Sequence, residues 1–275
     1  MKSEHAVEAH YSHGGLLETL LDALRRAGID PGQLGAEDLV AVEEFHIGGR
    51  QATAHLADVM GVTAGTRLLD VGSGIGGAAR YFALEHGCDV VGIDLTEEFC
   101  TVAEDLSARL GLSERTRFVH GSALDLPFED ASFDDACMLH VGMNIEDKER
   151  LLDEVSRVLR PAGRFAVYDV LAGSAEPHFP VPWAQDASTS FLVSADELCA
   201  LMESCGFEVV AQDDRTEAGL VFFRELAAAR EAGTAPAVAV PILMGDDGPE
   251  RLANTARSLE EGRIRPWLII GKKAS

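Results

Sequence analysis

A glycine-rich turn is the part of the sequence whose residue types point most directly to chemistry. The run LDVGSGIGG follows an apolar stretch and contains Asp70, Gly72, Gly74 and Gly77. Glycine lets a chain turn sharply, and it lets a ligand touch the backbone where a side chain would block the approach. A helix that begins after such a turn offers free N–H groups and partial positive charge. The turn therefore predicts a binding site for a small ligand that carries a carboxylate or a phosphate.

Two nucleotide cofactors fit this turn. Gly72, Gly74 and Gly77 satisfy the dinucleotide pattern G-x-G-x-x-G, which favours NAD(P). However, Asp70 stands two residues before the first glycine, where its charge would oppose a pyrophosphate and suit the sulfonium and ammonium of S-adenosylmethionine. Asp94 ends the next apolar run, where a carboxylate accepts hydrogen bonds from ribose hydroxyls. Because both cofactors contain that ribose, Asp94 predicts an adenosine ligand without choosing between them.

Apolar runs and helical patterns alternate through most of the chain. Strands are expected at residues 67–71, 89–93, 116–120, 133–139, 164–170, from 207, and at 266–271. Helices are expected at residues 16–27, 49–60, between the glycine turn and residue 87, 96–110, 146–159, 195–205, 220–232 and 250–261. This order predicts an α/β fold with a doubly wound, seven-stranded, mostly parallel sheet and an N-terminal helical extension.

The chain is expected to form one domain, residues 1–275, with three parts. Residues 1–64 would be an N-terminal helical cap, residues 65–171 the cofactor-binding core, and residues 172–275 a lid over the substrate followed by the C-terminal strands. The lid is expected because residues 171–191 break the alternating pattern and contain three prolines and Trp183. Long ordered connections of this kind are often binding segments.

The amino-acid composition limits the classes of partner that the chain is expected to bind. The 275 residues carry a formal net charge of −23, which disfavours nucleic acids and anionic membranes as partners. The five cysteines form no C-x-x-C pair, and no metal-ligand spacing is present, so reduced thiols and no metal are expected. With no apolar signal or spanning segment, a cytoplasmic location is expected. A homo-oligomer is left open.

The run from Arg67 to Asp169 resembles the core of a class I S-adenosylmethionine-dependent methyltransferase. The motifs that carry the resemblance are DVGSGIGG, GIDLT, GSALDLPFEDASFD and LRPAGRF. The flanking motifs YSHGGL, EFHIGGR and MNIEDK are similar to those of small-molecule methyltransferases near the sarcosine and dimethylglycine N-methyltransferase group. The resemblance implies a Rossmann-like methyltransferase fold, S-adenosylmethionine as cofactor and a small-molecule methyl acceptor.

The resemblance also implies roles for individual positions. Asp70, Gly72 and Gly74 would surround the methionine part of the cofactor, and Asp94 would hold the ribose. The adenine would lie against Leu95, Ser122 and Ala123. An acid often follows the glycine of that last loop in this family, but here it is Ser122, so water or backbone is expected to hold the adenine amino group. The methionine end would be closed by Tyr11, Phe45, His46 and Gly49.

The methyl acceptor is less well defined by the sequence. His140, at the end of the fourth strand, is the tentative catalytic residue, as a general base or an orienting group. A cofactor-wall residue that acts through its backbone is the favoured interpretation of His140. His178 is a weaker base candidate. Residues expected to touch the methyl acceptor are Met143, Asn144 and Trp183, although a buried lid anchor is an equal interpretation of Trp183.

N-methylation is slightly favoured, because an unprotonated amine needs no strong base. The alternative is C- or O-methylation of a natural-product or isoprenoid-type substrate. Two other classes stay open: an NAD(P)-dependent oxidoreductase and a non-catalytic adenosine-binding module.

Overall fold

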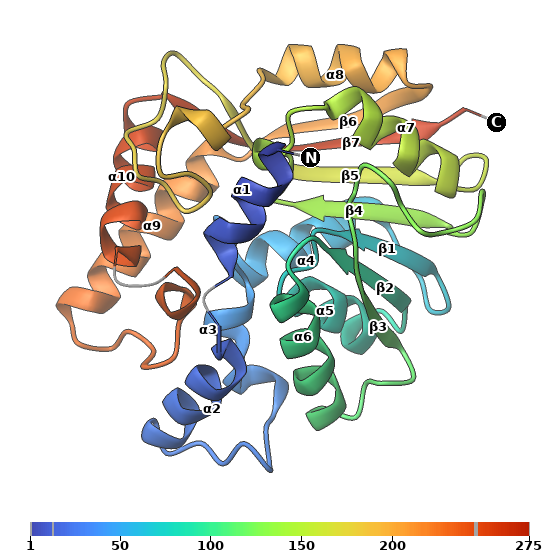
Figure 1. Cartoon of the computed structure of the whole chain (residues 1–275). Helices are drawn as coiled ribbons and strands as arrows, with labels where there is room; N and C mark the ends of the chain where they lie inside the picture. The colour runs from blue at the N-terminus through green and yellow to red at the C-terminus, as the bar shows by residue number, and fades with distance from the viewer. Residues whose placement is uncertain (1, 13, 245–246, 275) are drawn as a thin grey trace.

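The computed structural model describes residues 2–12, 14–244 and 247–274, and its centre is a seven-stranded sheet (Figure 1). The strands lie in the order β3-β2-β1-β4-β5-β7-β6, and β7 runs antiparallel to its two neighbours. The sequence prediction of a doubly wound, mostly parallel sheet is confirmed. The strands are β1 (Arg67–Val71), β2 (Asp89–Asp94), β3 (Thr116–His120), β4 (Asp135–Leu139), β5 (Arg164–Ala172), β6 (Phe207–Asp214) and β7 (Ile264–Lys273).

Helices cover both faces of the sheet because successive strand residues point to opposite sides. Leu68 packs in one core with helices α4 (Gly49–Met60), α5 (Gly77–Glu85) and α6 (Glu97–Arg109). Its neighbour Leu69 packs in the opposite core with α7 (Lys148–Val158) and α8 (Ala195–Ser204). The strands between these two layers of helices are buried on both sides, which agrees with the continuous apolar runs in the sequence.

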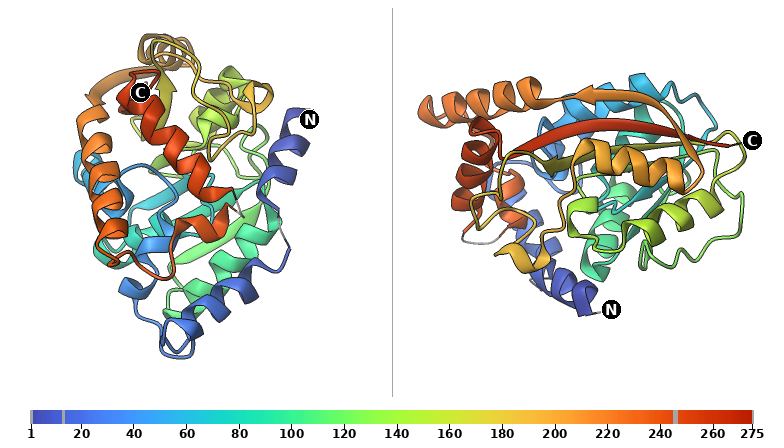
Figure 2. Two further views of the ribbon diagram at one scale, coloured as in Figure 1. Left: turned by 90° about the vertical axis from the view of Figure 1, so that its left-hand side faces the viewer. Right: turned by 90° about the horizontal axis from the view of Figure 1, so that it is seen from above.

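A third group of elements lies beyond the carboxyl ends of the parallel strands, where Figures 1 and 2 show helices from both ends of the chain. These are α1 (Lys2–Tyr11), α3 (Val40–Glu43), α9 (Thr216–Glu231) and α10 (Gly248–Glu260). Helix α2 (Leu16–Arg26) packs nearby on α6 through a shared apolar cluster. The N-terminal helical extension predicted from the sequence is therefore present, with α1 as an unpredicted addition.

Helix α1 and the start of β4 are two of the places where the structure differs from the predicted elements. Helix α1 was not predicted because its sequence, KSEHAVEAHY, has too few apolar residues to show a helical period. Strand β4 begins at Asp135 instead of residue 133, since Phe133 makes only an isolated parallel bridge with Leu159. Among the described residues, no helix is long and apolar enough to cross a membrane.

Candidate cofactor and substrate site

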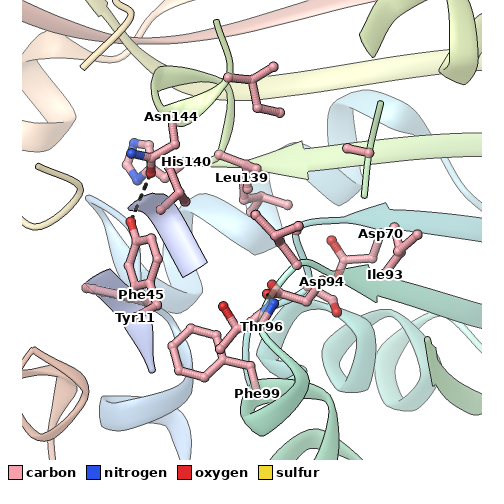
Figure 3. A pocket seen from close by; sticks show the side chains of 18 of the residues that line it. Tyr11, Phe45, Asp70, Ile93, Asp94, Thr96, Phe99, Leu139, His140 and Asn144 are labelled. Atoms are coloured by element: carbon pink, nitrogen blue, oxygen red, sulfur yellow. Dashed lines mark hydrogen bonds between the residues drawn. The ribbon is translucent and has the colours of Figure 1, made fainter. Parts of the chain in front are cut away.

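The order of the strands reverses beside β1, which pairs with β2 on one side and with β4 on the other. Ligands bind in such sheets at the carboxyl ends of the strands where this reversal leaves a crevice. Here the crevice is a cavity of about 640 Å³ (Figure 3). The residues predicted to bind the cofactor all line it: Tyr11, His46, Asp70, Gly72, Gly74, Asp94, Leu95, Ser122, Ala123 and His140.

Asp70 places an unsatisfied carboxylate in this cavity. Its side chain is 2% exposed, one oxygen is contacted by the Cys137 thiol at 3.7 Å, and Oδ2 has no partner among the described residues. Burial raises the pKa of Asp70 to about 7. A buried polar atom without a partner is costly, so this oxygen fits a ligand that brings a cation, such as the ammonium of S-adenosylmethionine, and opposes a phosphate.

Gly72 and Gly74 each require glycine, but for different structural reasons. Gly72 has a φ of +71°, and a Cβ there would lie 2.3 Å from Cγ2 of Val141, so the turn leaves no room for a side chain. Gly74 has a φ of +53°, and a Cβ there would meet nothing within 4 Å, so its backbone faces open space in the cavity. The first glycine permits the turn, and the second lets a ligand approach the backbone.

Asp94 is held in place by two backbone groups. Its Oδ2 accepts a hydrogen bond from the N–H of Gly74 and its Oδ1 from the N–H of Thr96, both at 2.8 Å. Thr96 occupies the N-cap position of α6 as predicted, but its own side chain makes no capping bond, and Asp94 supplies the cap instead. Because each carboxylate oxygen has a second acceptor position, Asp94 can orient the loop and still bind ribose hydroxyls.

At the predicted adenine end, Leu95, Ser122 and Ala123 are joined by an acid from the N-terminal helix. The Ser122 hydroxyl donates a hydrogen bond to the carboxylate of Glu4. Glu4, Val7 and Tyr11 line the cavity together, and their spacing places them on one face of α1. Glu4 was not predicted as a site residue, because nothing in the sequence of α1 indicates a helix or which of its faces is buried.

At the opposite end, His46 belongs to a buried polar cluster. Its Nε2 lies 2.9 Å from Oε2 of Glu44, which also accepts a hydrogen bond from Thr53 at 2.7 Å. Arg50 donates to the other Glu44 oxygen at 2.6 Å. Burial alone would raise the pKa of Glu44, but the bonds and charges of His46, Thr53 and Arg50 outweigh it and lower the pKa to about 2. Glu44 is thus ionised, so Nε2 of His46 carries the proton, and Nδ1 is buried without a described partner.

In His140 the other ring nitrogen, Nε2, is the one left without a partner. Its Nδ1 lies 3.1 Å from the backbone N–H of Ile47 and accepts its hydrogen bond, so the neutral ring carries its proton on Nε2. The ring stacks on Tyr168 with centroids 4.9 Å apart, and burial holds the pKa of His140 well below its usual value. Nε2 is buried without a described partner. Of the two chemical roles predicted for His140, this geometry favours the orienting donor over the general base.

A second cavity of about 470 Å³ lies next to the first. The two cavities share five lining residues: Tyr11, Glu44, Phe45, His46 and His140. The second cavity is otherwise walled mainly by apolar side chains: Val40, Ile47, Met143, Val170, Trp183, Phe222, Phe223, Leu226, Val240, Met244 and Leu252.

The predicted substrate residues are divided between the cavities. Met143 and Trp183 line the second cavity, whereas Asn144 lines the first. Trp183 is 2% exposed and its indole N–H donates to Oγ of Ser190 at 3.0 Å, so it is also a buried anchor of its loop. Gly49 lines the second cavity only. His178 is absent from the lining of both cavities and is paired with Glu261 at 2.7 Å.

Asn144 joins three separate segments. Its amide nitrogen donates to the carbonyls of Trp183 at 2.7 Å and Thr189 at 3.1 Å, and its oxygen accepts a bond from the Tyr11 hydroxyl at 3.0 Å (Figure 3). These bonds occupy both amide hydrogens and one acceptor position of the oxygen. Asn144 therefore ties α1 to the 172–194 connection, which leaves it little capacity for a direct contact with a substrate.

The fold and this site define an α/β protein with a cavity at the carboxyl ends of its parallel strands, a buried carboxylate in that cavity and an apolar chamber beside it. Comparisons with known proteins give the family. Residues 69–167 match the family model described as a methyltransferase domain. Within the described residues, no group of three or more His, Cys, Asp and Glu side chains is arranged to hold a metal ion.

Individual relatives agree with this match. The chain is 29% identical over 181 residues to the O-methyltransferase rstn1 of Aspergillus nomiae, an alignment that covers 65% of this chain and 80% of that protein. It is 27% identical over 225 residues to the methyltransferase GfsG of Streptomyces halstedii, covering 80% of this chain and 77% of that protein. A crystal structure of a putative sarcosine dimethylglycine methyltransferase from Galdieria sulphuraria has the same fold, with a TM-score of 0.64, 20% identity and coverage of 82% and 85%.

The chain is an S-adenosylmethionine-dependent methyltransferase of the class I family. The resemblance drawn from its sequence is confirmed, and with it the S-adenosylmethionine cofactor of that family. The oxidoreductase and the non-catalytic module are set aside, because the family model and the named relatives are methyltransferases.

Proposed function

We propose that this methyltransferase transfers a methyl group to a hydroxyl oxygen of a small, neutral, largely apolar molecule bound in the second cavity. The observation that carries the proposal is the apolar cavity of about 470 Å³ that shares His46 and His140 with the cofactor cavity. A methyl acceptor there would lie next to the methionine end of the cofactor. The names of relatives that include O-methyltransferases support this proposal.

The charges around the second cavity favour a neutral methyl acceptor. Arg50 lines the cavity, but its guanidinium is paired with Glu43 at 2.5 Å and Glu44 at 2.6 Å, so its charge is compensated. Arg230 also lines the cavity, but it is exposed to solvent. A phosphorylated molecule would lose hydration against this wall without a cluster of cations to replace it. N-methylation, which the sequence slightly favours, stays a prediction, and the residues that line the second cavity do not support it. C-methylation stays the alternative.

Two histidines provide the chemistry that a hydroxyl group needs. The unpartnered Nδ1 of His46 has a lone pair, and Glu44 holds the opposite Nε2–H, so His46 can take a proton and share the resulting charge with Glu44. This is the arrangement of a general base oriented by a carboxylate. The Nε2–H of His140 is a donor that can orient the methyl acceptor.

The cofactor residues follow from the first cavity. We infer that Asp70 binds the ammonium of the methionine part, Asp94 the ribose hydroxyls, and Leu95 and Ala123 the adenine faces. Bound S-adenosylmethionine supplies a methyl carbon activated by its sulfonium. The protein's contribution is to align the methyl acceptor with that carbon and to exclude water, which is worth several of the roughly 7–11 kcal/mol available from ideal alignment.

The connection at residues 172–194 would act as the lid over this chamber, in line with the predicted division of the domain. Pro182 and Trp183 line the chamber, and Arg251 of α10 donates to the carbonyl of Val181 at 3.1 Å and to Gln185 at 2.9 Å. These bonds hold the connection against α10, so the methyl acceptor would be enclosed between them.

The proposal can be tested with methyl-labelled S-adenosylmethionine and four probe acceptors: 2-naphthol, resveratrol, sarcosine and phosphoethanolamine. We expect label in the two neutral aromatic alcohols. Ala239→Trp fills a position that lines only the second cavity, so it should abolish labelling and preserve binding of S-adenosylhomocysteine. Ala228→Trp, on the exposed side of α9, is the matched control. Labelling of sarcosine or phosphoethanolamine in preference to the alcohols would refute the proposed class of methyl acceptor.

A further inference from the structure

The turn that follows β4 places His140 in a backbone conformation that neighbouring residues must maintain. The φ of His140 is +53°, in the left-handed region that residues other than glycine rarely adopt. Its backbone N–H donates to the carbonyl of Tyr168 in β5 at 2.8 Å. Such a conformation persists only where the surrounding contacts fix it. The groups that hold the rest of the turn, the 3₁₀ helix η2 (Gly142–Asn144), therefore help to set the direction of the His140 ring.

A buried lysine binds the carbonyl groups of this turn. Lys148, the first residue of α7, donates through Nζ to the carbonyls of Gly142 at 3.0 Å and Ile145 at 2.8 Å. Its third partner is the carbonyl of Phe191, near the end of the proposed lid, at 2.6 Å. The N–H of Phe191 in turn donates to the carbonyl of Met143 at 2.8 Å. Three acceptors need three N–H groups, so Lys148 is in its ammonium form and fastens the lid to η2.

A buried carboxylate faces the same turn from β5. Asp169 accepts the backbone N–H of Val170 at 2.9 Å, and a Cβ on Gly142 would lie 2.4 Å from its Oδ2, so only glycine fits against it. Burial raises the pKa of Asp169 to about 7, while the charge of Lys148 and three backbone N–H groups, two of them in η2, act in the opposite direction. The turn is therefore held between a buried cation at its carbonyl groups and a buried carboxylate at its N–H groups.

Resting on the proposed function, we propose that Lys148 and Asp169 are positioning residues for methyl transfer, which hold the turn so that the His140 ring faces the methyl acceptor and the lid stays against η2. Neither side chain lines the cofactor cavity or the second cavity, so their effect on the rate passes through other residues. Burying charges costs free energy that an apolar filling would not. Here the charges fix the peptide groups of η2, which places Met143 at the second cavity and Asn144 at the first.

A double-mutant cycle tests whether Lys148 acts through His140. The quantity measured is kcat/KM for whichever of the four probe acceptors the wild type labels best, at a temperature at which every variant is folded. Lys148→Met should lower kcat/KM about a hundredfold, the loss expected from a small displacement near the reacting groups, and should change S-adenosylhomocysteine affinity less than about threefold. In a His140→Phe background, the same substitution should lower kcat/KM less than about threefold, because the group it positions is already absent. Equal factors in the two backgrounds would overturn the proposal.

A matched control separates positioning from stability. Arg164→Met also removes a partly buried cation, but Arg164 pairs with Asp135 at 2.7 Å where β4 and β5 begin, at the opposite end of these strands from the cavities. This control should lower the melting temperature and leave kcat/KM unchanged. Asp169→Asn, which is of nearly the same size, should reproduce the loss seen in Lys148→Met, and it provides the test if the lysine variant does not fold. An equal loss of rate in Arg164→Met contradicts the proposal.

A measurement without a methyl acceptor distinguishes this proposal from the proposed function. Nitrogen NMR of the imidazole rings, with the His140 signals assigned by their loss in His140→Phe, should show a proton on Nε2, because Nδ1 accepts the N–H of Ile47. Lys148→Met and Asp169→Asn should mix the two tautomers of His140, and Arg164→Met should not. An unchanged tautomer in both variants overturns the positioning role even if the alcohols are methylated. Mixed tautomers in variants of a protein that labels sarcosine instead support the positioning role and refute only the proposed methyl acceptor.

Discussion

The Tyr11 hydroxyl donates to the side-chain oxygen of Asn144 over 3.0 Å and so joins residues 133 positions apart in the chain. Tyr11 also packs edge-on against Phe45, with ring centroids 6.3 Å apart, and it lines both cavities. Tyr11 therefore connects helix α1 with the segment after α3 that carries Phe45 and, through Asn144, with the connection that follows β5. This contact fastens helix α1 to the segment that carries Asn144, at the rim shared by the two cavities.

Tyr11→Phe should weaken the attachment of α1 at the site without unfolding the protein. The variant removes one buried hydrogen bond, worth about 0.5–1.5 kcal/mol, so the dissociation constant of S-adenosylhomocysteine should rise about two- to tenfold. Calorimetry gives the affinity, and a thermal melt of the free protein gives its stability. Because the ring and its contacts with Phe45 and Phe99 are kept, the melting temperature should fall by only a few degrees. An unchanged affinity would show that the Tyr11–Asn144 hydrogen bond does not contribute to holding the cofactor.

Asp94→Ala should have a larger effect on cofactor binding. It removes the carboxylate proposed to hold the ribose, and it also frees the N–H groups of Gly74 and Thr96. Loss of hydrogen bonds to a charged group predicts a weakening of about 1.5–3 kcal/mol for S-adenosylhomocysteine, measured by calorimetry. Asp94→Asn keeps one oxygen acceptor and should lose less. If Asp94→Ala binds as tightly as the wild type, Asp94 is only a cap for α6.

Much of the core was predictable from sequence because its signals are local. Strand β1 at Arg67–Val71, helix α4 at Gly49–Met60 and strand β3 at Thr116–His120 have the predicted bounds, since apolar period and flanking glycines define them. The predicted cofactor residues converge on one cavity for a related reason. The glycine turn and Asp94 follow neighbouring parallel strands, whose carboxyl ends must meet.

What could not be predicted depends on contacts between distant segments. Glu4 reaches the cavity through α1, which has no apolar period, and only the folded chain brings it to Ser122. The separate roles of His46 and His140 depend on which ring nitrogen meets Glu44 or the N–H of Ile47. Residue type and spacing show that a histidine is available, but its tautomer is set by tertiary hydrogen bonds. The cytoplasmic location stays a prediction.

Asp70 predicts a pH dependence of cofactor binding. Its pKa is raised by burial to about 7, above the ordinary value of 3.8, so the free folded protein holds the Asp70 proton more tightly than the unfolded chain does. This group therefore lowers the stability of the free protein as pH rises from about 4 to 7. A bound ammonium favours the ionised carboxylate, so the complex binds the proton less tightly than the free protein.

Binding of S-adenosylhomocysteine should consequently release a proton below pH 7. Affinity should rise about tenfold or more between pH 5.5 and 7.5, and calorimetry in buffers of different ionisation enthalpy should detect the released proton. Asp70→Asn is the control, because it keeps the size of the side chain but cannot titrate. If the variant shows the same proton release as the wild type, another group in the cavity is responsible.

The proposed general base gives the last prediction. His46→Gln should lower kcat for a neutral alcohol by about 10²–10⁴, since the variant has no basic nitrogen at Nδ1. S-adenosylhomocysteine affinity should change much less, because the ammonium and ribose contacts assigned to Asp70 and Asp94 are untouched. A purely structural role for His46 would reduce the rates of all methyl acceptors equally. A base instead matters only where a proton must be removed, so a phenol already ionised at the assay pH, such as 4-nitrophenol above pH 8, should lose little rate in the variant. Equal losses for 2-naphthol and 4-nitrophenol would exclude His46 as the base. Alignment of the methyl acceptor would then be the main contribution of His46.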